Sequence, residues 1–432
     1  MDRFIYSLLL YLLCPFVMLR LLWRFKKNSA YGRRWNERFG FIRPLLSDKQ
    51  IIWMHAVSVG ETIASAPLVM ALMKSYPAYR FLITTMTPTG SDQVKAIYGD
   101  MVEHTYMPYD LPDALYRYLN RTNPKLVLIF ETELWPNTIA ACKKRGTPVV
   151  IANARLSERS AKGYQRISRL TRNMLNQLSV VACQNIEDGK RFVRLGLDAE
   201  KLQIIGSIKF DINISSETLN AAKAIRSNWE KGFGRQAQVL IAASTHSEEE
   251  QIIINAYINL KKQYPDLLLV VVPRHLERFD AFYDLACNSG LTVKRYNQDT
   301  NVTPNTQVIL GDVMGEMMKL YAASDIAFVG GSLIERGGHN VLEPAVLGLP
   351  VLSGPHTFNF HNISMSLEQA GGLIFVNNTE ELTAEVDRLL TDGDHYNNTK
   401  NRAKQFVDDN RGALVRLLKI ISNVLANSHH SN

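Results

Sequence analysis

Cysteine is scarce in this chain of 432 residues. Its four cysteines are scattered and none belongs to a C-x-x-C pair; they are Cys14, Cys142, Cys183 and Cys287. This spacing excludes a disulfide framework and a structural zinc site. Low-complexity tracts are also lacking, and 46% of the residues are hydrophobic against 21% charged, which excludes a largely disordered chain. We therefore expect an ordered protein of a reducing, cytoplasmic setting.

Length and charge set two further bounds. The chain is too long for one ordinary hydrophobic core and suits two domains of roughly 200 residues each. Lys and Arg number 49 against 41 Asp and Glu, which gives a formal net charge of +8. An excess of positive charge favours an anionic partner.

An uncharged apolar run lies near the N-terminus, from Phe4 to Leu19. It is shorter than the roughly 20 residues that span a bilayer, and Pro15 interrupts it. Basic residues follow the run and no small-residue cleavage site comes after it, which argues against a cleaved signal peptide. We expect residues 1–27 to form an uncleaved membrane anchor with its basic flank in the cytoplasm. The alternative is a buried core helix.

The rest of the chain alternates apolar, β-branched runs with stretches of helical length. The runs are QIIWMHAVS, YRFLITTMT, PKLVLIF, TPVVIANA, LSVVACQ and LQIIGS before Ile212, and QVLIAAS, DLLLVVVPR, TQVILGD, DIAFVGGS, GLPVLSG and GGLIFV after it. Such alternation is typical of parallel sheets covered by helices on both faces. A pause in NISSETLNAAK, after Ile212, separates two similar sets. The pattern predicts an α/β fold with Rossmann-like domains at 28–213 and 214–432, which face a central cleft at the carboxyl ends of their strands. A final helical segment, about 400–426, is expected to pack back on the first domain.

The densest candidate site lies in VGGSLIERGGHNVLEP, residues 329–344. Its glycines let the backbone approach a ligand, and a helix expected from Asn340 offers free N–H groups to an anion. Glu343 falls in the first turn of that helix, where a carboxylate can reach a polyol such as ribose. The alternative is a plain capped helix after a glycine-rich turn.

Three other segments converge on the same sheet edge. Arg274 directly follows an apolar strand, where its guanidinium can contact a phosphate or a base edge. Gly315 opens a helix after another strand, with backbone groups available for a nucleobase. Residues 244–246 close a third strand, either as ligand contacts or with Ser244 or Ser247 as an N-cap.

One carboxylate is prominent in the first domain. The segment HAVSVGETIAS, residues 55–65, ends a strand, turns at Gly60 and starts a helix with Glu61. We expect the helix dipole to keep Glu61 ionised and its side chain to face the second domain, where it can take a proton from an attacking hydroxyl. The alternative is a first-turn glutamate that only stabilises the helix.

Two more carboxylates, Glu131 and Glu133, follow the strand PKLVLIF. Alternation along the chain directs both to one side, and Glu131, nearer the strand end, is the one expected in the cleft. The alternative for Glu131 is an ion pair with Arg155 or another nearby basic residue. Lys209, in GSIKFD, lies just before the domain connection; it is either an anion contact or a solvated lysine.

A basic segment at residues 152–176 carries only one acidic residue, Glu158. Its basic residues are Arg155, Arg159, Lys162, Arg166, Arg169 and Arg172. Several recur at three- or four-residue spacing, which gathers charge along one helix face. No interleaved aromatic residues accompany them, so we expect no nucleic-acid partner. Together with the anchor, this face suits an anionic lipid surface; a solvated face is the alternative.

Seven motifs in a fixed order carry a resemblance to a known family. They are SVGE, ETELWPN, GSIKFD, PRH, GDVMGEM, GGHNVLEP and GPHTFNF. Over nearly its whole length the chain is similar to the 3-deoxy-D-manno-octulosonic acid (Kdo) transferases of lipopolysaccharide synthesis. Met317 stands where that family usually has leucine, a conservative change.

The resemblance implies a GT-B glycosyltransferase fold with an N-terminal anchor at the cytoplasmic side of the inner membrane. It implies inverting transfer of Kdo from CMP-Kdo to the lipid A precursor (lipid IVA), without a cofactor or metal. Glu61 is then the general base, Glu131 and Lys209 stabilise the transition state, and Lys209 binds the carboxylate of Kdo. The CMP-binding residues that the resemblance implies are Pro273, Arg274, Met314, Gly315, Glu316, Asn340, Val341, Leu342 and Glu343.

Metal independence is also expected from the residues. Metal-dependent sugar transferases generally hold a divalent ion with a D-x-D motif, and we expect this chain to lack one. A CMP-sugar has a single phosphate, which Arg274 and the helix end near Asn340 can stabilise. Two other functions fit the same fold: a nucleotide-sugar epimerase, which needs no lipid acceptor, and a non-catalytic nucleotide-sugar binding protein, which tolerates loss of Glu61.

Overall fold

The computed structural model describes residues 1–27, 29–45, 49–297 and 302–429. The chain divides into two compact units, unit 1 (Met1–Asp211 and Arg411–Asn432) and unit 2 (Ile212–Asn410). The first crossing between them lies next to the connection expected at residue 213. Asn28, at the expected end of the anchor, lies outside the described residues.

Unit 1 contains a parallel sheet of seven strands in the order β3-β2-β1-β4-β5-β6-β7. The strands are β1 Ile51–His55, β2 Arg80–Thr85, β3 Glu103–Tyr106, β4 Pro124–Phe130, β5 Val149–Ala154, β6 Val180–Cys183 and β7 Leu202–Ile204. The helices are α1 Arg3–Lys27, α2 Val59–Ser75, α3 Pro88–Tyr98, α4 Pro112–Thr122, α5 Pro136–Lys144, α6 Glu158–Gln165, α7 Ser168–Leu175, α8 Ile186–Arg194 and α17 Ala413–His429.

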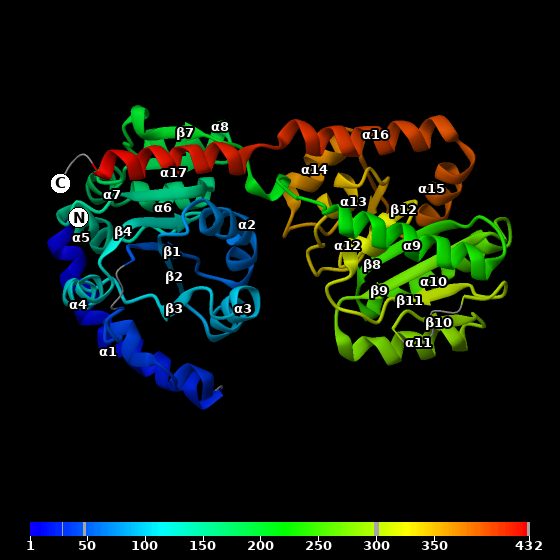
Figure 1. The fold of residues 1–432 in the computed structure, drawn as a ribbon, viewed down its shortest axis with the longest axis horizontal. Helices are drawn as coiled ribbons and strands as arrows, with labels where there is room; N and C mark the ends of the chain where they lie inside the picture. The colour runs from blue at the N-terminus through cyan, green and yellow to red at the C-terminus, as the bar shows by residue number, and fades with distance from the viewer. Residues whose placement is uncertain (28, 46–48, 298–301, 430–432) are drawn as a thin grey trace. The chain divides into compact units, whose positions relative to one another are not determined.

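Both faces of this sheet are buried, because alternate residues of each strand point to opposite sides. Trp53 and Val127 belong to one core, and Met54 and Leu128 belong to the other. The second core is closed by one side of α17, which runs along unit 1 in red in Figure 1. Its buried residues are Ala413, Leu417, Ile421 and Leu425.

The C-terminal segment differs from the single helix expected at 400–426. Two helices form this segment, because residues 411 and 412 separate the end of α16 (Gly393–Asn410) from the start of α17. Gly412 lies between them with a φ of 93°, a left-handed conformation that glycine adopts without steric cost. The first of these helices belongs to unit 2 and the second to unit 1.

Helix α1 continues through Pro15 instead of stopping there. Its segment Arg3–Lys26 is long and apolar enough to cross a membrane, and none of its apolar window is buried, so the core-helix alternative is wrong. Polar side chains nevertheless attach α1 to unit 1: the hydroxyl of Tyr6 donates to Asp110 Oδ2 at 3.0 Å and that of Tyr11 to Asp113 Oδ1 at 2.6 Å. The helix lies beside α4 and α5 (Figure 1).

Unit 2 repeats the architecture with a second parallel sheet, in the order β10-β11-β9-β8-β12-β13-β14. The strands are β8 Gln238–Thr245, β9 Leu267–Pro273, β10 Val293–Arg295, β11 Val308–Leu310, β12 Ile326–Val329, β13 Val351–Ser353 and β14 Leu373–Phe375. The helices other than α16 are α9 Ser216–Phe233, α10 Ser247–Lys261, α11 Phe279–Asn288, α12 Met317–Ala322, α13 Leu342–Val346, α14 His361–Gln369 and α15 Thr379–Thr391.

The strand order places the candidate residues. In each sheet the order reverses direction at the centre, between β1 and β4 in unit 1 and between β8 and β12 in unit 2. Open parallel sheets bind ligands beyond the carboxyl ends of their strands at such switch points. Glu61 and Glu131 follow the central strands of unit 1, and the residues around His246 and the glycines from Gly330 follow those of unit 2.

Candidate active site

Glu61 is the third residue of α2, and its carboxylate is held at the end of β1. Its Oε2 accepts a hydrogen bond from the N–H of Val57 at 2.9 Å, and its Oε1 accepts one from the hydroxyl of Ser58 at 3.2 Å. Ser58 in turn accepts from the N–H of Glu61 at 3.3 Å. Glu61 therefore caps its helix, as the alternative interpretation has it, and the same bonds fix the carboxylate in place.

Burial has the largest effect on the ionisation of Glu61, raising its pKa above the ordinary value. The hydrogen bond from Val57 opposes this shift, the negative charge of Glu131 adds to it, and Ser58 and Lys209 oppose it. The expected effect of the helix dipole is thus outweighed by burial. A carboxylate with a raised pKa is a stronger base, and these influences also show that Glu131 and Lys209 lie near Glu61.

Glu131 directly follows β4 in a left-handed conformation, with a φ of 59°. This conformation is uncommon for a residue other than glycine and is concentrated at functional sites. The N–H of Glu131 donates to the carbonyl of Ala152 on β5 at 2.9 Å, which anchors its backbone to the neighbouring strand. Both Glu131 and Arg155 are described, and no ion pair joins them.

Asn153, which is not among the expected site residues, positions the turn that carries Lys209. Lys209 lies in the short turn Ile208–Phe210, whose first N–H donates to Asn153 Oδ1 at 3.2 Å. Asn153 is fully buried near the end of β5 and is left-handed, with a φ of 56°. A lone asparagine within the apolar strand VVIANA is the signal that points to such a role.

Glu133 also lies within electrostatic reach of Glu61. Burial, and then the negative charge of Glu61, raise the pKa of Glu133 to about 7. Both Glu131 and Glu133 thus interact electrostatically with Glu61, and the expectation that Glu131 is the one in the cleft stays a prediction. Three carboxyl groups and one lysine meet at this edge of the unit 1 sheet.

We expect the protein to lose stability as pH rises from about 5 to about 8, and Glu133→Gln to reduce this loss. The folded-state pKa near 7 lies above the ordinary 4.5, so the folded state binds this proton more tightly than the unfolded state does. The stabilisation is complete below about pH 4.5 and is lost as pH rises through about 7. Thermal unfolding midpoints at about pH 5 and pH 8 measure it, with exposed Glu200→Gln as the control. An unchanged pH dependence in Glu133→Gln would contradict the expectation.

In unit 2, Arg274 directly follows β9, and its N–H donates to the carbonyl of Thr245 on β8 at 3.0 Å. Its side chain is exposed. Burial raises the pKa of Glu343, while a hydrogen bond from the amide of Asn340, at 3.2 Å, and the charge of Arg274 oppose that shift. Arg274, Asn340 and Glu343 are therefore neighbours, as a nucleotide site there requires.

The helix expected from Asn340 starts two residues later and is short. Helix α13 has five residues, and Asn340 Oδ1 accepts from the N–H of Leu342 at 3.2 Å. A helix of this length has little macrodipole to attract an anion, and the anion site expected at its N-terminus stays a prediction. Gly330 is required instead for packing, because a Cβ there would lie 2.7 Å from Glu249 Oε1 and 2.8 Å from the carbonyl oxygen of Ser244.

Residues Met314, Gly315 and Glu316 follow β11, which neighbours β9 in the sheet. Gly315 is left-handed, with a φ of 83° and open space around it. Glu316 pairs with Lys319 at 2.7 Å. This segment thus lies one strand along from Arg274, with its backbone accessible.

The N-cap of α10, the helix that follows β8, differs from the expectation. His246, and not Ser244 or Ser247, precedes α10, and its N–H donates to Glu249 Oε1 at 3.0 Å. Glu249 is fully buried and also accepts from three successive N–H groups after β12, those of Gly331 at 2.5 Å and of Ser332 and Leu333 at 3.3 Å. Glu249 carries no signal of this role in the sequence, because in SEEE it is indistinguishable from its two neighbours.

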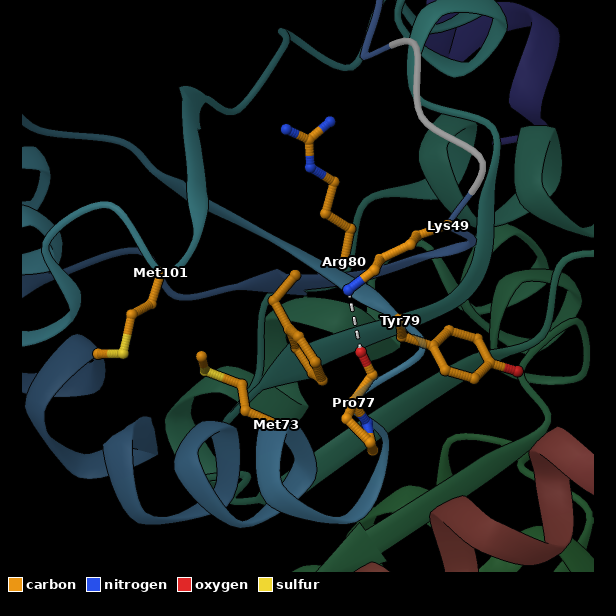
Figure 2. Close-up of a pocket in the computed structure, with 7 residues that line it drawn as sticks. Lys49, Met73, Pro77, Tyr79, Arg80 and Met101 are labelled. Atoms are coloured by element: carbon orange, nitrogen blue, oxygen red, sulfur yellow. Dashed lines mark hydrogen bonds between the residues drawn. The ribbon is translucent and has the colours of Figure 1, made fainter.

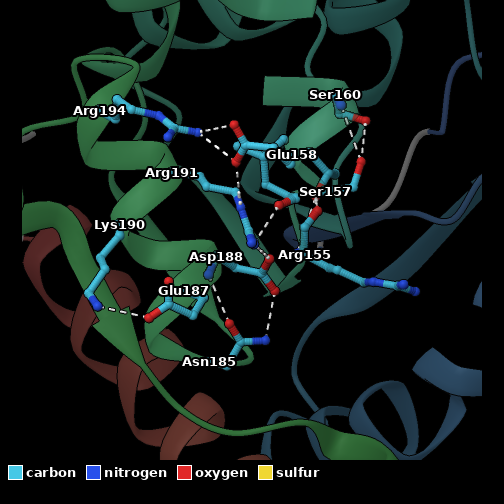
Figure 3. Close-up of polar contacts among 12 residues, drawn as sticks. Arg155, Ser157, Glu158, Ser160, Asn185, Glu187, Asp188, Lys190, Arg191 and Arg194 are labelled. Carbon is cyan, nitrogen blue, oxygen red and sulfur yellow. Dashed lines mark hydrogen bonds and ion pairs between the residues drawn. The ribbon is translucent and has the colours of Figure 1, made fainter. Parts of the chain in front are cut away.

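The basic segment folds into two short helices, so its basic residues do not lie along one face of a single helix. Helix α6 ends at Gln165 and α7 starts at Ser168, with Ile167 outside helical geometry (φ −118°, ψ 38°). The side chains of all six predicted basic residues are exposed. Figure 3 shows Arg191 and Arg194 of α8 directed at Glu158, with which they pair at 3.2 and 2.8 Å.

A separate cavity of 560 Å³ lies at the other end of the unit 1 strands. Figure 2 shows its lining residues, which are Lys49, Met73, Pro77, Tyr79, Arg80, Phe81 and Met101. Arg80 begins β2, whereas Glu61 follows the carboxyl end of β1. This cavity is therefore not part of the candidate active site.

The expectation that the chain lacks a D-x-D motif is wrong, because Asp392-Gly393-Asp394 is such a triplet. The triplet is exposed and lies at the start of α16, away from the strand ends, and Asp392 Oδ1 accepts from the N–H of His395 at 2.9 Å. Asp392 therefore caps α16. Within residues 1–27, 29–45, 49–297 and 302–429, no three His, Cys, Asp or Glu side chains are grouped so as to hold a metal ion.

Two family models match the chain. The first, described as 3-deoxy-D-manno-octulosonic-acid transferase (kdotransferase), matches residues 33–212. The second, described as glycosyl transferases group 1, matches residues 235–406. The matches fall on unit 1 and unit 2, respectively.

Related proteins match over almost the whole length. A 3-deoxy-D-manno-octulosonic acid transferase of Haemophilus influenzae is 43% identical over 423 residues, which is 98% of each chain. A protein of the same name from Bordetella pertussis is 34% identical and covers 87% of this chain and 88% of its own. The solved structure of a UDP-GlcNAc 2-epimerase from Neisseria meningitidis is 16% identical, with a TM-score of 0.56 over 88% of this chain and all of that one; it shows a shared GT-B-like fold. By its identity to full-length relatives, the chain belongs to the 3-deoxy-D-manno-octulosonic acid transferase family of glycosyltransferases.

Proposed function

We propose that the chain transfers Kdo from CMP-Kdo to a hydroxyl of the lipid A precursor, lipid IVA, with inversion at the anomeric carbon. The observation that carries the proposal is the grouping of Glu61, Glu131 and Lys209 at the carboxyl edge of the unit 1 sheet in a chain of this family. Glu61 takes the proton of the attacking hydroxyl as its oxygen bonds to the anomeric carbon. Inversion follows from a single displacement on the side opposite the phosphate.

Glu131 and Lys209 have complementary roles in this step. The positive Lys209 attracts the carboxylate of Kdo, which positions the sugar. The negative Glu131 helps to keep the pKa of Glu61 raised and stabilises positive charge that develops at the anomeric carbon. The left-handed backbone of Glu131 supports such a role, because strained residues persist where function requires them.

The donor nucleotide is assigned to unit 2. Arg274, next to Pro273, contacts the phosphate, and Glu343, within Asn340 to Glu343, accepts hydrogen bonds from the ribose hydroxyls. The backbone of Met314 to Glu316 receives the base. Arg274 supplies the positive charge that a metal supplies in pyrophosphate-using transferases, so we propose that no metal or cofactor takes part.

A membrane location at the cytoplasmic side of the inner membrane is part of the proposal. The apolar side chains of α1 are exposed, among them Phe4, Leu12 and Phe16. The exposed arginines of α6 and α7, such as Arg159 and Arg169, add attraction to an anionic lipid or to a phosphorylated acceptor. No nucleic acid is expected as a partner.

Release of CMP that depends on the acceptor tests the reaction. We expect the full chain to release CMP from CMP-Kdo when lipid IVA is present, and at most about a hundredth as fast without it, because a hydroxyl nucleophile is required. The rate should be unchanged in EDTA. Equal release without acceptor, or loss of activity in EDTA that magnesium restores, would contradict the proposal. The number of Kdo residues added is read from the mass of the lipid product.

The same assay with lipid IVA embedded in anionic vesicles tests the membrane role. A chain that begins at residue 29 should lose activity on vesicles and keep it on acceptor dispersed in detergent. Equal activity of both chains on vesicles would contradict the proposed role of residues 1–27 as a membrane anchor.

A further inference from the structure

Two imidazole rings meet edge to edge at the carboxyl edge of the unit 2 sheet. His246 follows β8 and His339 ends the loop after β12, and their Nε2 atoms are 3.1 Å apart. The ring planes are within 6° of parallel, with centroids 5.4 Å apart. Because the nitrogens are much closer than the centroids, the two Nε2 atoms point at each other. One of them must donate a hydrogen and the other must accept it.

The glycine next to the pair is required by its geometry. Gly331 is left-handed, with a φ of 67°. A Cβ at this position would lie 3.0 Å from His339 Nε2 and 3.4 Å from His246 Cδ2. The backbone of Gly331 therefore packs directly against both rings, and its N–H is bound to Glu249.

The surroundings keep the pair neutral in the free protein. Burial, then Arg274, His246 and His275, lower the pKa of His339 to about 4. Burial, then His275 and Arg336, lower the pKa of His246; Glu248 opposes this shift, and Arg274 adds slightly to it. At neutral pH the two rings thus share one N–H···N bond and carry no charge.

The acidic groups around the pair are already engaged. The charged and titratable neighbours are Arg274, His275, Arg336, Glu248 and Glu249. Glu248 pairs with Arg336 at 2.9 Å, and Glu249 binds the N–H groups of His246 and Gly331. Among the described residues neither Arg274 nor His275 forms a salt bridge, and His275 lies edge-on to His246 with centroids 5.4 Å apart. The pair therefore lies in positive surroundings that suit an anion.

We propose that the His246–His339 pair binds the nucleotide phosphate beside Arg274 and takes up one proton when it does so. The inference rests on the proposed function, since it takes CMP-Kdo as the ligand. A proton added to the pair keeps the bond between the Nε2 atoms and leaves an N–H on both Nδ1 atoms, with one positive charge over the two rings. A bound anion favours this charged form and offsets the cost of burying it.

The proton serves the leaving group. In the transfer step the bond between the anomeric carbon and the phosphate oxygen breaks, and its electron pair stays on that oxygen. The acceptor hydroxyl forms the new bond and gives its proton to Glu61. The phosphate thereby changes from one negative charge to two, and the protonated pair and Arg274 stabilise the added charge.

Calorimetry of the full chain tests the inference. Cytidine 5′-methyl phosphate carries one charge that does not titrate near neutral pH, so any proton taken up on binding goes to the protein. Heats in two pH 7 buffers of different ionisation enthalpy should show uptake of about 0.5 to 1 proton for this probe and for CMP, and none for cytidine. His339→Gln should abolish the uptake and weaken binding of the methyl phosphate about tenfold, with cytidine binding unchanged.

Controls separate the possible outcomes. His361→Gln, an exposed histidine at the start of α14, should behave as wild type. His246→Gln repeats the test on the other ring, and ¹⁵N shifts of the wild-type histidine rings locate the proton even where a variant does not fold. Tight binding of both nucleotides without proton uptake between about pH 6 and 8 overturns the inference. The proposal that CMP-Kdo is the donor is not affected by that result. Failure of any cytidine nucleotide to bind overturns the proposed donor and the inference together.

Discussion

Glu61→Gln is expected to lower turnover by roughly 10²- to 10⁴-fold, the range that general-base catalysis contributes. Glutamine keeps the size of the side chain, and its one oxygen can still accept the hydrogen bond from Val57 while its NH2 group donates to the hydroxyl of Ser58, but its amide cannot take a proton. Turnover is measured with saturating CMP-Kdo and lipid IVA. Because CMP binding is assigned to unit 2, the affinity for CMP should stay within about twofold of wild type.

Two further variants distinguish a base from a helix cap. Ser58→Ala removes the capping hydroxyl and should cost about 1 kcal/mol of stability while keeping most of the turnover. Glu187→Gln changes an exposed first-turn glutamate of α8 and should change neither property. A folded Glu61→Gln protein that retained more than about a tenth of wild-type turnover would rule out the base assignment.

The fold could be predicted from the sequence wherever strands are buried on both faces. The apolar, β-branched runs identified all the central strands, because parallel strands under two layers of helices must be apolar throughout. The two strands that were missed, β3 with the sequence EHTY and β10 with VKR, lie at sheet edges. An edge strand has one neighbour and tolerates polar residues, so β3 and β10 can lack the apolar signal that the other two edge strands, β7 and β14, retain.

The candidate site was predictable where a residue is marked by the motif around it. Glu61, Glu131 and Lys209 occur in separate motifs, and the structure brings them together. Asn153, Glu249 and the pairing of His246 with His339 were not predicted. Their roles depend on which loops meet across neighbouring strands, and this is set by the strand order and not by local sequence.

Glu249 illustrates that dependence and gives the prediction with the largest effect on stability. Its buried carboxylate accepts hydrogen bonds from four backbone N–H groups, one at the start of α10 and three in the loop after β12. These bonds oppose the effect of burial, which is the larger one and raises the pKa of Glu249. The carboxylate therefore joins the two loops that carry His246 and His339.

Glu249→Ala is expected to lower the free energy of unfolding by about 3–5 kcal/mol, because it leaves several buried N–H groups without an acceptor. That is a large part of the stability of an ordinary domain, so the variant should also lose most CMP affinity. Urea unfolding measures the change, and Glu249→Gln, which keeps one oxygen acceptor, should lose roughly half as much. Glu248→Ala is the matched control: its side chain is exposed, pairs with Arg336 and accepts a hydrogen bond from the hydroxyl of Ser247, so little change is expected. Equal stability of Glu249→Ala and Glu248→Ala would show that water or the backbone replaces the carboxylate, and that the two loops do not depend on Glu249 for their arrangement.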